Sequence, residues 1–282
     1  MEDLKNTKIW KRNKNHNTIV KCNDVNFGEG FFTVIAGPCA IENSEMALKT
    51  AKEVEKLGAS VFRSSLFKPR TSPYSFQGIG KEGVNILAEI RSQTNLLLES
   101  EVLSEEHLDI LIDHIDIIRI GSRNMDNYEL LKIVGKINKP VILKRGMSST
   151  LKEFLFAAEY IIEAGNEQII LCERGIRSFD NYTRNTLDIL AVPSLKELTH
   201  LPVIVDPSHS TGKRSLVPSA SKAAIAAGAD GLMIEVHPDP TEALSDGDQS
   251  IDFFTFEKLM KEIKKLLEIF DKSTIFKNEL SN

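Results

Sequence analysis

Short apolar runs alternate with longer segments of helical period along almost the whole chain. Eight runs rich in β-branched residues predict strands over residues 32–36, 60–64, 96–99, 115–120, 141–144, 168–172, 203–206 and 231–236. Between and after them, apolar residues recur three and four apart. This spacing predicts helices over residues 46–57, 84–90, 108–112, 130–137, 154–164, 187–198, 220–227 and 253–270. Eight strands, each followed by a helix, predict an α/β fold with a closed parallel (β/α)8 barrel, the TIM barrel.

The segment before the first barrel strand has a different pattern. Residues 18–22 and 25–31 predict a short β-hairpin that covers one end of the barrel. We therefore expect an N-terminal extension with this hairpin over residues 1–31, the barrel over residues 32–271 and a C-terminal tail over residues 272–282. About 30 residues are too few for a separate regulatory domain of ordinary size.

Composition and charge exclude several classes of protein. Of the 282 residues, 41% are hydrophobic and 27% are charged, which is ordinary for a globular enzyme and argues against disorder. A formal net charge of -5 argues against a protein that coats nucleic acid or an anionic membrane. Three scattered cysteines indicate no disulfide framework, and the polar N-terminus is not a signal peptide. We expect a cytoplasmic protein without a nucleic-acid or membrane partner.

Cationic side chains lie near the ends of several predicted strands. In a TIM barrel the active site is built at the carboxyl ends of the strands. The cations expected there are Arg63, Lys68, Arg70, Arg123, Lys144 and Arg174. Converging cations repel one another, so the set indicates an anionic ligand, and phosphate suits arginine well. Any one of them can instead pair with Glu99, Glu101 or Glu173, but that alternative explains six together poorly.

A second group of residues near the strand ends indicates a metal site. Cys39, His209, Glu235 and Asp246 supply a thiol, an imidazole and two carboxylates, a donor set that suits a divalent transition metal. Each has a simpler interpretation, because Cys39 also fits a buried core position, His209 an ordinary hydrogen-bonded histidine and Asp246 a solvated turn. His237, two residues after Glu235, is a candidate for supporting the site.

Five segments carry a resemblance to a known family. They are residues 35–42 (IAGPCAIE), 67–78 (FKPRTSPYSFQG), 171–175 (LCERG), 206–210 (DPSHS) and 234–238 (IEVHP). In this order, over residues 18–270, the chain closely resembles 3-deoxy-D-arabino-heptulosonate 7-phosphate (DAHP) synthases of the type Iβ subfamily, also called phospho-2-dehydro-3-deoxyheptonate aldolases. That family has a (β/α)8 barrel, which agrees with the fold expected from the periodicity.

The resemblance implies a metal-dependent transferase. Its members condense phosphoenolpyruvate with erythrose 4-phosphate and water to give DAHP and phosphate, the first step of the shikimate pathway to chorismate and the aromatic amino acids. It places the metal ligands on Cys39, His209, Glu235 and Asp246. It places phosphoenolpyruvate contacts on Arg63, Lys68, Arg123, Lys144 and Arg174, and the aldose phosphate on Arg70, Thr71 and Ser72. Catalytic roles fall on Lys68, Cys39 and His209.

The resemblance also implies properties of the whole protein. Mn²⁺ is the metal expected, with Fe²⁺, Zn²⁺ and Co²⁺ as alternatives, and a homotetramer or homodimer is expected. Lys68 is the candidate for protonating the new alkoxide or steering the phosphoenolpyruvate carboxylate. The attacking water is activated either by being bound to the metal or by Glu173, and both alternatives are open. Since residues 1–31 fit neither a ferredoxin-like nor a chorismate-mutase-like domain, we expect no fused mutase and no feedback by tyrosine, phenylalanine or prephenate through one.

Two alternative functions remain open at the level of sequence. The first is 3-deoxy-D-manno-octulosonate 8-phosphate (KDO8P) synthase, which uses phosphoenolpyruvate and arabinose 5-phosphate on the same barrel. Members of that family resemble Lys-Ala-Asn-Arg-Ser-Ser where this chain has Lys-Pro-Arg-Thr-Ser at residues 68–72, which favours DAHP. The second is a non-catalytic barrel that binds phosphorylated metabolites, although such a sensor does not need four metal ligands.

Overall fold

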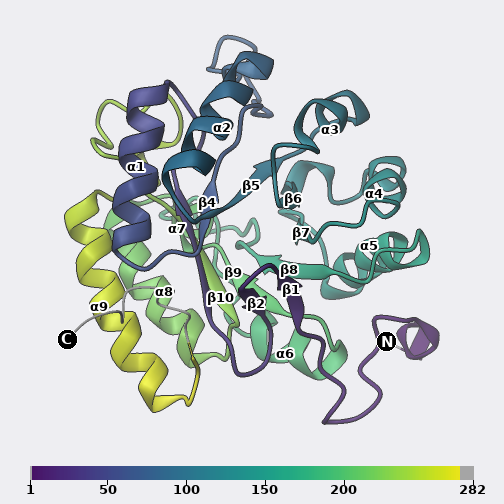
Figure 1. The fold of residues 1–282 in the computed structure, drawn as a ribbon. Helices are drawn as coiled ribbons and strands as arrows, with labels where there is room; N and C mark the ends of the chain where they lie inside the picture. The colour runs from purple at the N-terminus through teal and green to yellow at the C-terminus, as the bar shows by residue number, and fades with distance from the viewer. Residues whose placement is uncertain (1, 274–282) are drawn as a thin grey trace.

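The computed structural model describes residues 2–273, and a closed barrel of eight parallel strands forms its centre (Figure 1). The strand order around the barrel is β10-β3-β4-β5-β6-β7-β8-β9. The strands are β3 (Thr33–Gly37), β4 (Val61–Arg63), β5 (Leu97–Glu101), β6 (Ile117–Ile120), β7 (Val141–Lys144), β8 (Ile169–Glu173), β9 (Val203–Val205) and β10 (Gly231–Glu235). Every predicted strand is present with its bounds shifted by no more than two residues, so the predicted fold class is confirmed.

Helices form a ring around the barrel (Figure 1). They are α1 (Ser44–Lys56), α2 (Val84–Gln93), α3 (Glu105–Leu111), α4 (Tyr128–Val134), α5 (Leu151–Glu163), α6 (Ala191–Leu198), α7 (Pro207–Thr211), α8 (Val217–Ala226) and α9 (Phe253–Ile269). Several begin at a side-chain cap. Thr150 and Glu153 form a reciprocal capping box at the start of α5, which satisfies amide groups that the helix itself leaves unpaired. The short α7 was not predicted, because five residues are too few to show a helical period.

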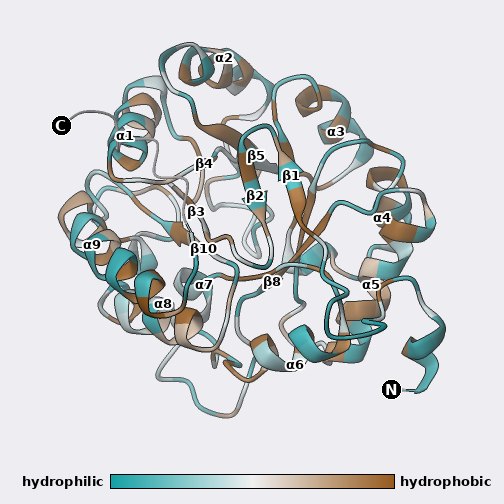
Figure 2. Cartoon of the chain, turned by 60° about the horizontal axis from the view of Figure 1, so that its bottom comes forward, coloured by the Kyte–Doolittle hydropathy of each residue, from teal (hydrophilic) through white to brown (hydrophobic). Residues whose placement is uncertain are grey.

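The outer core lies between the helices and the barrel. Each long helix turns an apolar face to the strands, and Phe154 of α5 and Phe256 of α9 are fully buried there. The hydropathy colouring shows the same division, with polar residues on the outward faces of the helices (Figure 2). This two-faced pattern is the reason that helical periodicity was readable in the sequence.

A two-stranded antiparallel hairpin covers the amino-terminal end of the barrel, as predicted. Its strands are β1 (Val20–Cys22) and β2 (Val25–Phe27), and they lie across the centre of the helix ring (Figure 2). Val20, Val25 and Phe27 form one buried cluster with apolar side chains of the barrel interior, including Ile35 and Ile117. The hairpin therefore closes this end of the barrel with hydrophobic side chains.

The barrel interior changes character along its length. Val61, Leu97, Ile117, Ile142 and Met233 belong to the apolar cluster under the hairpin. Because strand side chains repeat their direction every two residues, the next inward positions toward the carboxyl end are Arg63, Glu99, Arg119, Lys144 and Glu235. All five are buried. Two residues further along each of these strands, the barrel interior is therefore charged instead of hydrophobic.

The last described residues return to the start of the barrel. The amide of Phe32 donates to the carbonyl of Ser273 at 2.9 Å, just before β3 begins. The predicted tail over residues 272–282 lies largely outside the described residues, which end at 273. Within residues 2–273, no helix is both long and apolar enough to cross a membrane.

Candidate active site

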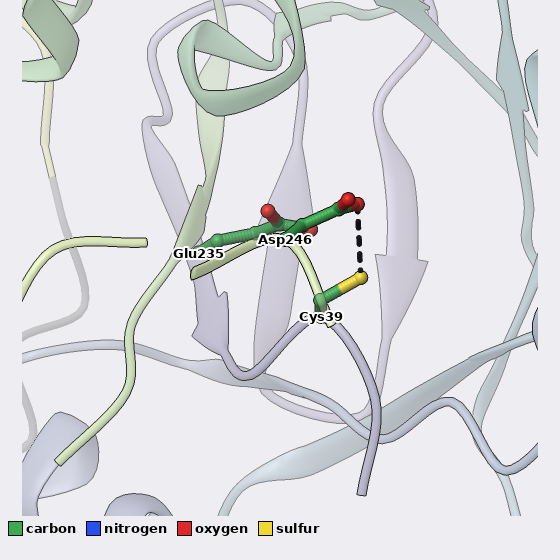
Figure 3. Close-up of side chains that lie close together, drawn as sticks. All are labelled: Cys39, Glu235 and Asp246. Carbon is green, nitrogen blue, oxygen red and sulfur yellow. Dashed lines mark hydrogen bonds between the residues drawn. The ribbon is translucent and has the colours of Figure 1, made fainter. Parts of the chain in front are cut away.

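The carboxyl ends of the barrel strands bring together three side chains that could hold a metal ion. Cys39 follows β3, Glu235 ends β10, and Asp246 lies in the loop between β10 and α9. One ligand atom from each lies within 4.8 Å of the others, and Figure 3 shows the three side chains converging. The Cys39 thiol donates a hydrogen bond to Asp246 Oδ2 at 3.3 Å. Residues up to 207 positions apart in the sequence therefore form one cluster.

His209 adjoins this cluster through its Nε2 atom. That atom lies 3.5 Å from Glu235 Oε1 and 3.8 Å from Asp246 Oδ2. Its position depends on Asp206, which caps α7 by accepting the His209 amide and also contacts His209 Nδ1 at 2.8 Å through Oδ2. Burial lowers the pKa of His209 to about 4, even though Asp206 and Glu235 oppose the shift. A neutral imidazole that donates from Nδ1 to a carboxylate presents a free Nε2 lone pair, as metal-binding histidines do.

These four donors fit a divalent transition metal. A thiol, an imidazole and two carboxylates form the mixed donor set that such ions accept. Burial raises the pKa of the Cys39 thiol to about 12, with the carboxylate of Glu235 adding to the shift. A bound cation reverses this, because a coordinating thiol loses its proton. The candidate ligands from the sequence thus lie together or in contact.

Other buried groups hold the candidate ligands in place. Arg63 Nη2 donates to Glu235 Oε1 at 2.7 Å, and Gln249 Nε2 donates to Glu235 Oε2 at 2.6 Å. The Ser245 hydroxyl donates to Cys39 Sγ at 3.0 Å. His237, the sequence candidate for support, lies instead with its Nε2 3.6 Å from Glu42.

Gly37 sets the direction in which the chain leaves β3. Its φ of 148° belongs to the region that favours glycine. A Cβ atom there would lie 2.9 Å from the Arg63 carbonyl oxygen. This close approach lets Pro38 and Cys39 turn over the barrel end beside β4.

A cavity of about 230 Å³ opens beside the donor cluster. Ten of its lining residues carry a charge or an imidazole: Lys68, Arg70, Glu101, Arg119, Arg123, Lys144, Arg174, Arg184, His209 and Asp246. Thr71 and Ser72 also line it. Cations outnumber the two carboxylates, so the cavity suits a ligand with several negative charges.

Several of the predicted cations have carboxylate partners, as the alternative interpretation allowed. Lys68 Nζ lies 3.3 Å from Glu101 Oε2, and Lys144 Nζ lies 2.5 Å from Asp206 Oδ2. Burial alone would raise the pKa of Glu101, but Lys68 and Arg119 lower it to about 2. Arg63 is fully buried, pairs with Glu235 and does not line the cavity. It therefore lies behind the donor cluster rather than at the opening.

Two other predicted cations have no carboxylate partner among residues 2–273. Arg123 makes no ion pair there, and the hydrogen bonds of the Arg174 guanidinium go to the carbonyls of Gly175 and His209, at 3.2 and 3.4 Å. The Nε atom of Arg174 is buried without a hydrogen-bond partner, and burial lowers the pKa of this guanidinium. Both side chains line the cavity, so their unused donors are available to an anionic ligand.

Two arginines that line the cavity, Arg119 and Arg184, were not among the predicted cations. Arg119 in β6 bonds to Glu99 at 2.8 Å and to Glu101 at 3.0 Å. A charged residue within the apolar run Ile-Ile-Arg-Ile is the sequence signal for a charge buried inside the barrel. Arg184 lies in the loop between β8 and α6, and no local sequence pattern distinguishes it from a solvated residue.

Glu173, one candidate for activating water, is placed away from this role. Its Oε2 accepts from Arg145 Nη1 at 2.9 Å and its Oε1 accepts from the Gly175 amide at 2.6 Å. It does not line the cavity. Its carboxylate is therefore held by Arg145 and the Gly175 amide, away from the cavity.

Comparisons with known proteins agree with the fold and point to one family. The model of the DAHP synthetase I family matches residues 10–269. A phospho-2-dehydro-3-deoxyheptonate aldolase from Thermotoga maritima is 52% identical over 251 residues, covering 89% of this chain and 74% of that protein. A 2-dehydro-3-deoxyphosphooctonate aldolase from Acidithiobacillus ferrooxidans is 32% identical over 248 residues, covering 82% of this chain and 87% of that protein.

Solved structures give the same relationship. The crystal structure of the Thermotoga maritima DAHP synthase matches with a TM-score of 0.92 and 48% identity, covering 95% of this chain and 78% of that one. A truncated form of the same enzyme matches with a TM-score of 0.86 and 46% identity, covering 92% of this chain and 95% of that one.

Proposed function

Because the chain belongs to the DAHP synthetase I family, we propose that it condenses phosphoenolpyruvate with erythrose 4-phosphate and water to give DAHP and phosphate. This is the first step of the shikimate pathway to the aromatic amino acids. The observation that carries the proposal is one cavity with a thiol, imidazole and carboxylate cluster at one wall and uncompensated arginines at another. The 52% identity to the Thermotoga maritima aldolase supports the same reaction.

We propose a divalent cation as cofactor, held by Cys39, His209, Glu235 and Asp246. Mn²⁺ is the first candidate, and Fe²⁺, Zn²⁺ and Co²⁺ are alternatives that the same donors accept. When bound, the cation supplies Lewis-acid chemistry to the aldehyde oxygen.

The protein's own side chains bind the substrates and move protons during the condensation. C3 of phosphoenolpyruvate forms a bond to C1 of the aldose, whose carbonyl oxygen takes up a proton. Water adds to C2, the C2–O bond to phosphate breaks, and phosphate leaves. Lys68 is placed to donate the proton or to hold the phosphoenolpyruvate carboxylate. Burial alone would lower the pKa of Lys68, but Cys39 and Glu101 raise it, so its ammonium stays protonated at neutral pH.

The two substrates are assigned to different parts of the cavity. We place phosphoenolpyruvate against Lys68, Arg123, Lys144 and Arg174, with Arg63 behind the metal ligands. The sugar phosphate is assigned to Arg70, Thr71 and Ser72. Arg70 Nη1 lies 3.6 Å from Asp246 Oδ1, so a phosphate held by this arginine lies close to the donor cluster. That short span suits a four-carbon aldose and disfavours the five-carbon substrate of KDO8P synthase.

The assay that tests the function follows the ultraviolet absorbance of phosphoenolpyruvate. We expect the absorbance to fall when erythrose 4-phosphate and Mn²⁺ are added, and chelator to stop the reaction. Arabinose 5-phosphate in parallel tests the KDO8P alternative, and its faster consumption would refute the proposal. Binding of both phosphates without any loss of absorbance would favour the non-catalytic barrel.

We also propose a homotetramer or homodimer and a cytoplasmic location, on the family resemblance and the cysteine content. Sedimentation of the purified protein measures the first.

A further inference from the structure

A buried amide lies between a candidate metal ligand and a cation of the cavity. Gln249 is only 2% exposed. Its Nε2 donates to Glu235 Oε2 at 2.6 Å, and its Oε1 accepts from Arg184 Nη1 at 2.8 Å. Neither Gln249 nor Arg184 belongs to the motifs that identified the family.

The chemistry of the three groups decides which way the amide faces. A guanidinium can only donate hydrogen bonds, and an ionised carboxylate can only accept them. The amide oxygen must therefore face Arg184, and the amide nitrogen must face Glu235. A reversed amide would place its oxygen against the carboxylate and its nitrogen against the guanidinium, and both contacts would be repulsive.

This arrangement leaves the Glu235 carboxylate fully constrained. Arg63 holds Oε1 at 2.7 Å, while Gln249 holds Oε2. The oxygen held by Arg63 is also the one that lies 3.5 Å from His209 Nε2. Rotation of the carboxylate would break both hydrogen bonds, so its orientation toward the donor cluster depends on Gln249.

The local backbone couples Gln249 and Arg184 to the other ligands. Gln249 ends a 3-10 turn over Gly247–Gln249, and its backbone N–H donates to the carbonyl of Asp246 at 3.2 Å. The backbone N–H of Arg184 donates to the carbonyl of Thr211 at 3.1 Å, at the end of the helix that carries His209. Both residues are thus built into the elements that present the ligands.

We propose that Gln249 is a positioning residue for Glu235, and that Arg184 sets the direction of its amide. The inference rests on the proposed metal site. Groups that orient ligands in this way typically change metal affinity 10- to 100-fold when they are removed.

Removal of Arg184 separates this proposal from simple electrostatics, because the two predict opposite changes in metal affinity. Its guanidinium lies 3.5 Å from Asp246 Oδ1, so removing the charge would by itself favour a cation at the cluster. If Arg184 instead acts by fixing Gln249, its removal frees the amide to turn and metal affinity falls. The two effects have opposite directions.

The experiment measures binding of Co²⁺ alone, followed by the sulfur-to-metal charge-transfer absorbance that a thiolate ligand produces. Gln249→Leu, which cannot hold Glu235, is expected to weaken Co²⁺ binding roughly 10- to 100-fold. Arg184→Gln is expected to weaken it by less. Matched controls are Asn166→Leu and Arg177→Gln, which are expected to keep the wild-type affinity. Asn166 is a buried amide bonded to the carbonyls of Ile137 and Lys139, and Arg177 shares the loop of Arg184.

Unfolding of each metal-free variant is measured in parallel. A purely structural role predicts lower stability with unchanged Co²⁺ affinity, and that result in Gln249→Leu overturns the proposal. If Gln249→Leu does not fold, Arg184→Gln decides, because unchanged or tighter binding overturns the proposal and weaker binding supports it. A wild-type protein without the charge-transfer band overturns both this inference and the proposed metal site, whereas a normal wild-type band with unaffected variants overturns the inference alone.

Discussion

The two ends of the barrel are built on the same strands and meet opposite requirements. At the amino-terminal end, Phe27 of the hairpin belongs to one buried apolar cluster with Ile117 and other side chains of the barrel interior. At the carboxyl end, two residues further along β6, Arg119 is just as buried but bonds to Glu99 and Glu101. The amino-terminal end stabilises the fold by removing apolar surface from water. The carboxyl end contributes less stability, because burying charges has a desolvation cost, but it holds those charges in fixed positions. Stability and function are thus separated along one barrel axis, as is general for this fold.

The largest effect on activity is expected from removing the thiol at the open end. Cys39→Ala should abolish the condensation and metal binding, because it removes a ligand rather than a group that supports one. The free energy of unfolding of the metal-free protein should change little. Parallel measurements of activity, Co²⁺ binding and urea denaturation test this. An active Cys39→Ala variant would contradict the proposed metal site.

The largest effect on stability is expected at the closed end. Phe27→Ala should lower the free energy of unfolding by about 3–5 kcal/mol, because a fully buried aromatic side chain leaves a cavity. The activity per folded molecule should stay near that of the wild type. Urea denaturation gives the first quantity and titrated active enzyme the second. A large loss of turnover with normal stability would break the proposed separation of the two ends.

A smaller, selective effect is expected at the mouth of the cavity. Arg70→Ala should weaken the binding of erythrose 4-phosphate by about 1.5–3 kcal/mol, since one charged hydrogen-bonding group is lost. This corresponds to a roughly 10- to 150-fold lower affinity. Phosphoenolpyruvate should be affected far less, as its contacts are assigned to other side chains. Separate KM measurements for the two substrates provide the comparison. Equal weakening of both would show that the assignment of Arg70 is wrong.

The smallest expected effect is a pH dependence of the segment beside the closed end. His200 contacts Thr18 Oγ1 at 2.7 Å and stacks on His16. Burial lowers its pKa below the ordinary 6.5, with the Lys8 carbonyl, Glu167 and Glu159 opposing the shift and His16 adding to it. The unfolded chain therefore binds the proton more readily, and this group's contribution to stability is present above pH 6.5 and declines as the pH falls below it.

That contribution is measured by urea denaturation of the wild type and of His200→Gln between pH 7.5 and 5.5. The wild type should lose slightly more stability than the variant over this range. If both respond identically, His200 contributes no pH dependence of its own.

Most of the fold was predictable because its elements have repeated local patterns. Strands buried on both faces are continuous apolar runs, and Val141–Lys144 was predicted with its observed bounds. Helices with one apolar face show a period of 3.6 residues, as α9 does. The short α7 has no period to detect, because it depends on the Asp206 cap and ends at Gly212, whose φ is 65°.

The candidate site was predictable only in part. Strand ends pointed to Cys39, Lys68, His209 and Glu235, and resemblance to the family assigned the sugar phosphate to Thr71 and Ser72. Gln249 and Arg184 were missed, because nothing in a short polar loop indicates which side chains turn inward. The sequence also placed Arg63 at the opening, whereas the structure buries it behind Glu235.

Taken alone, the amino-acid sequence determined the barrel, its covering hairpin and the residue types available for chemistry, because burial periodicity and strand ends are local properties. Which carboxylate each buried cation would meet was decided only in the tertiary structure. Lys68 meets Glu101 because β4 and β5 are neighbouring strands. Arg63 meets Glu235 because closing the barrel joins β10 to β3 and brings positions 172 residues apart into hydrogen-bond contact. Electrostatic pairing in a buried site depends on distances of a few ångströms, and no sequence spacing encodes those distances.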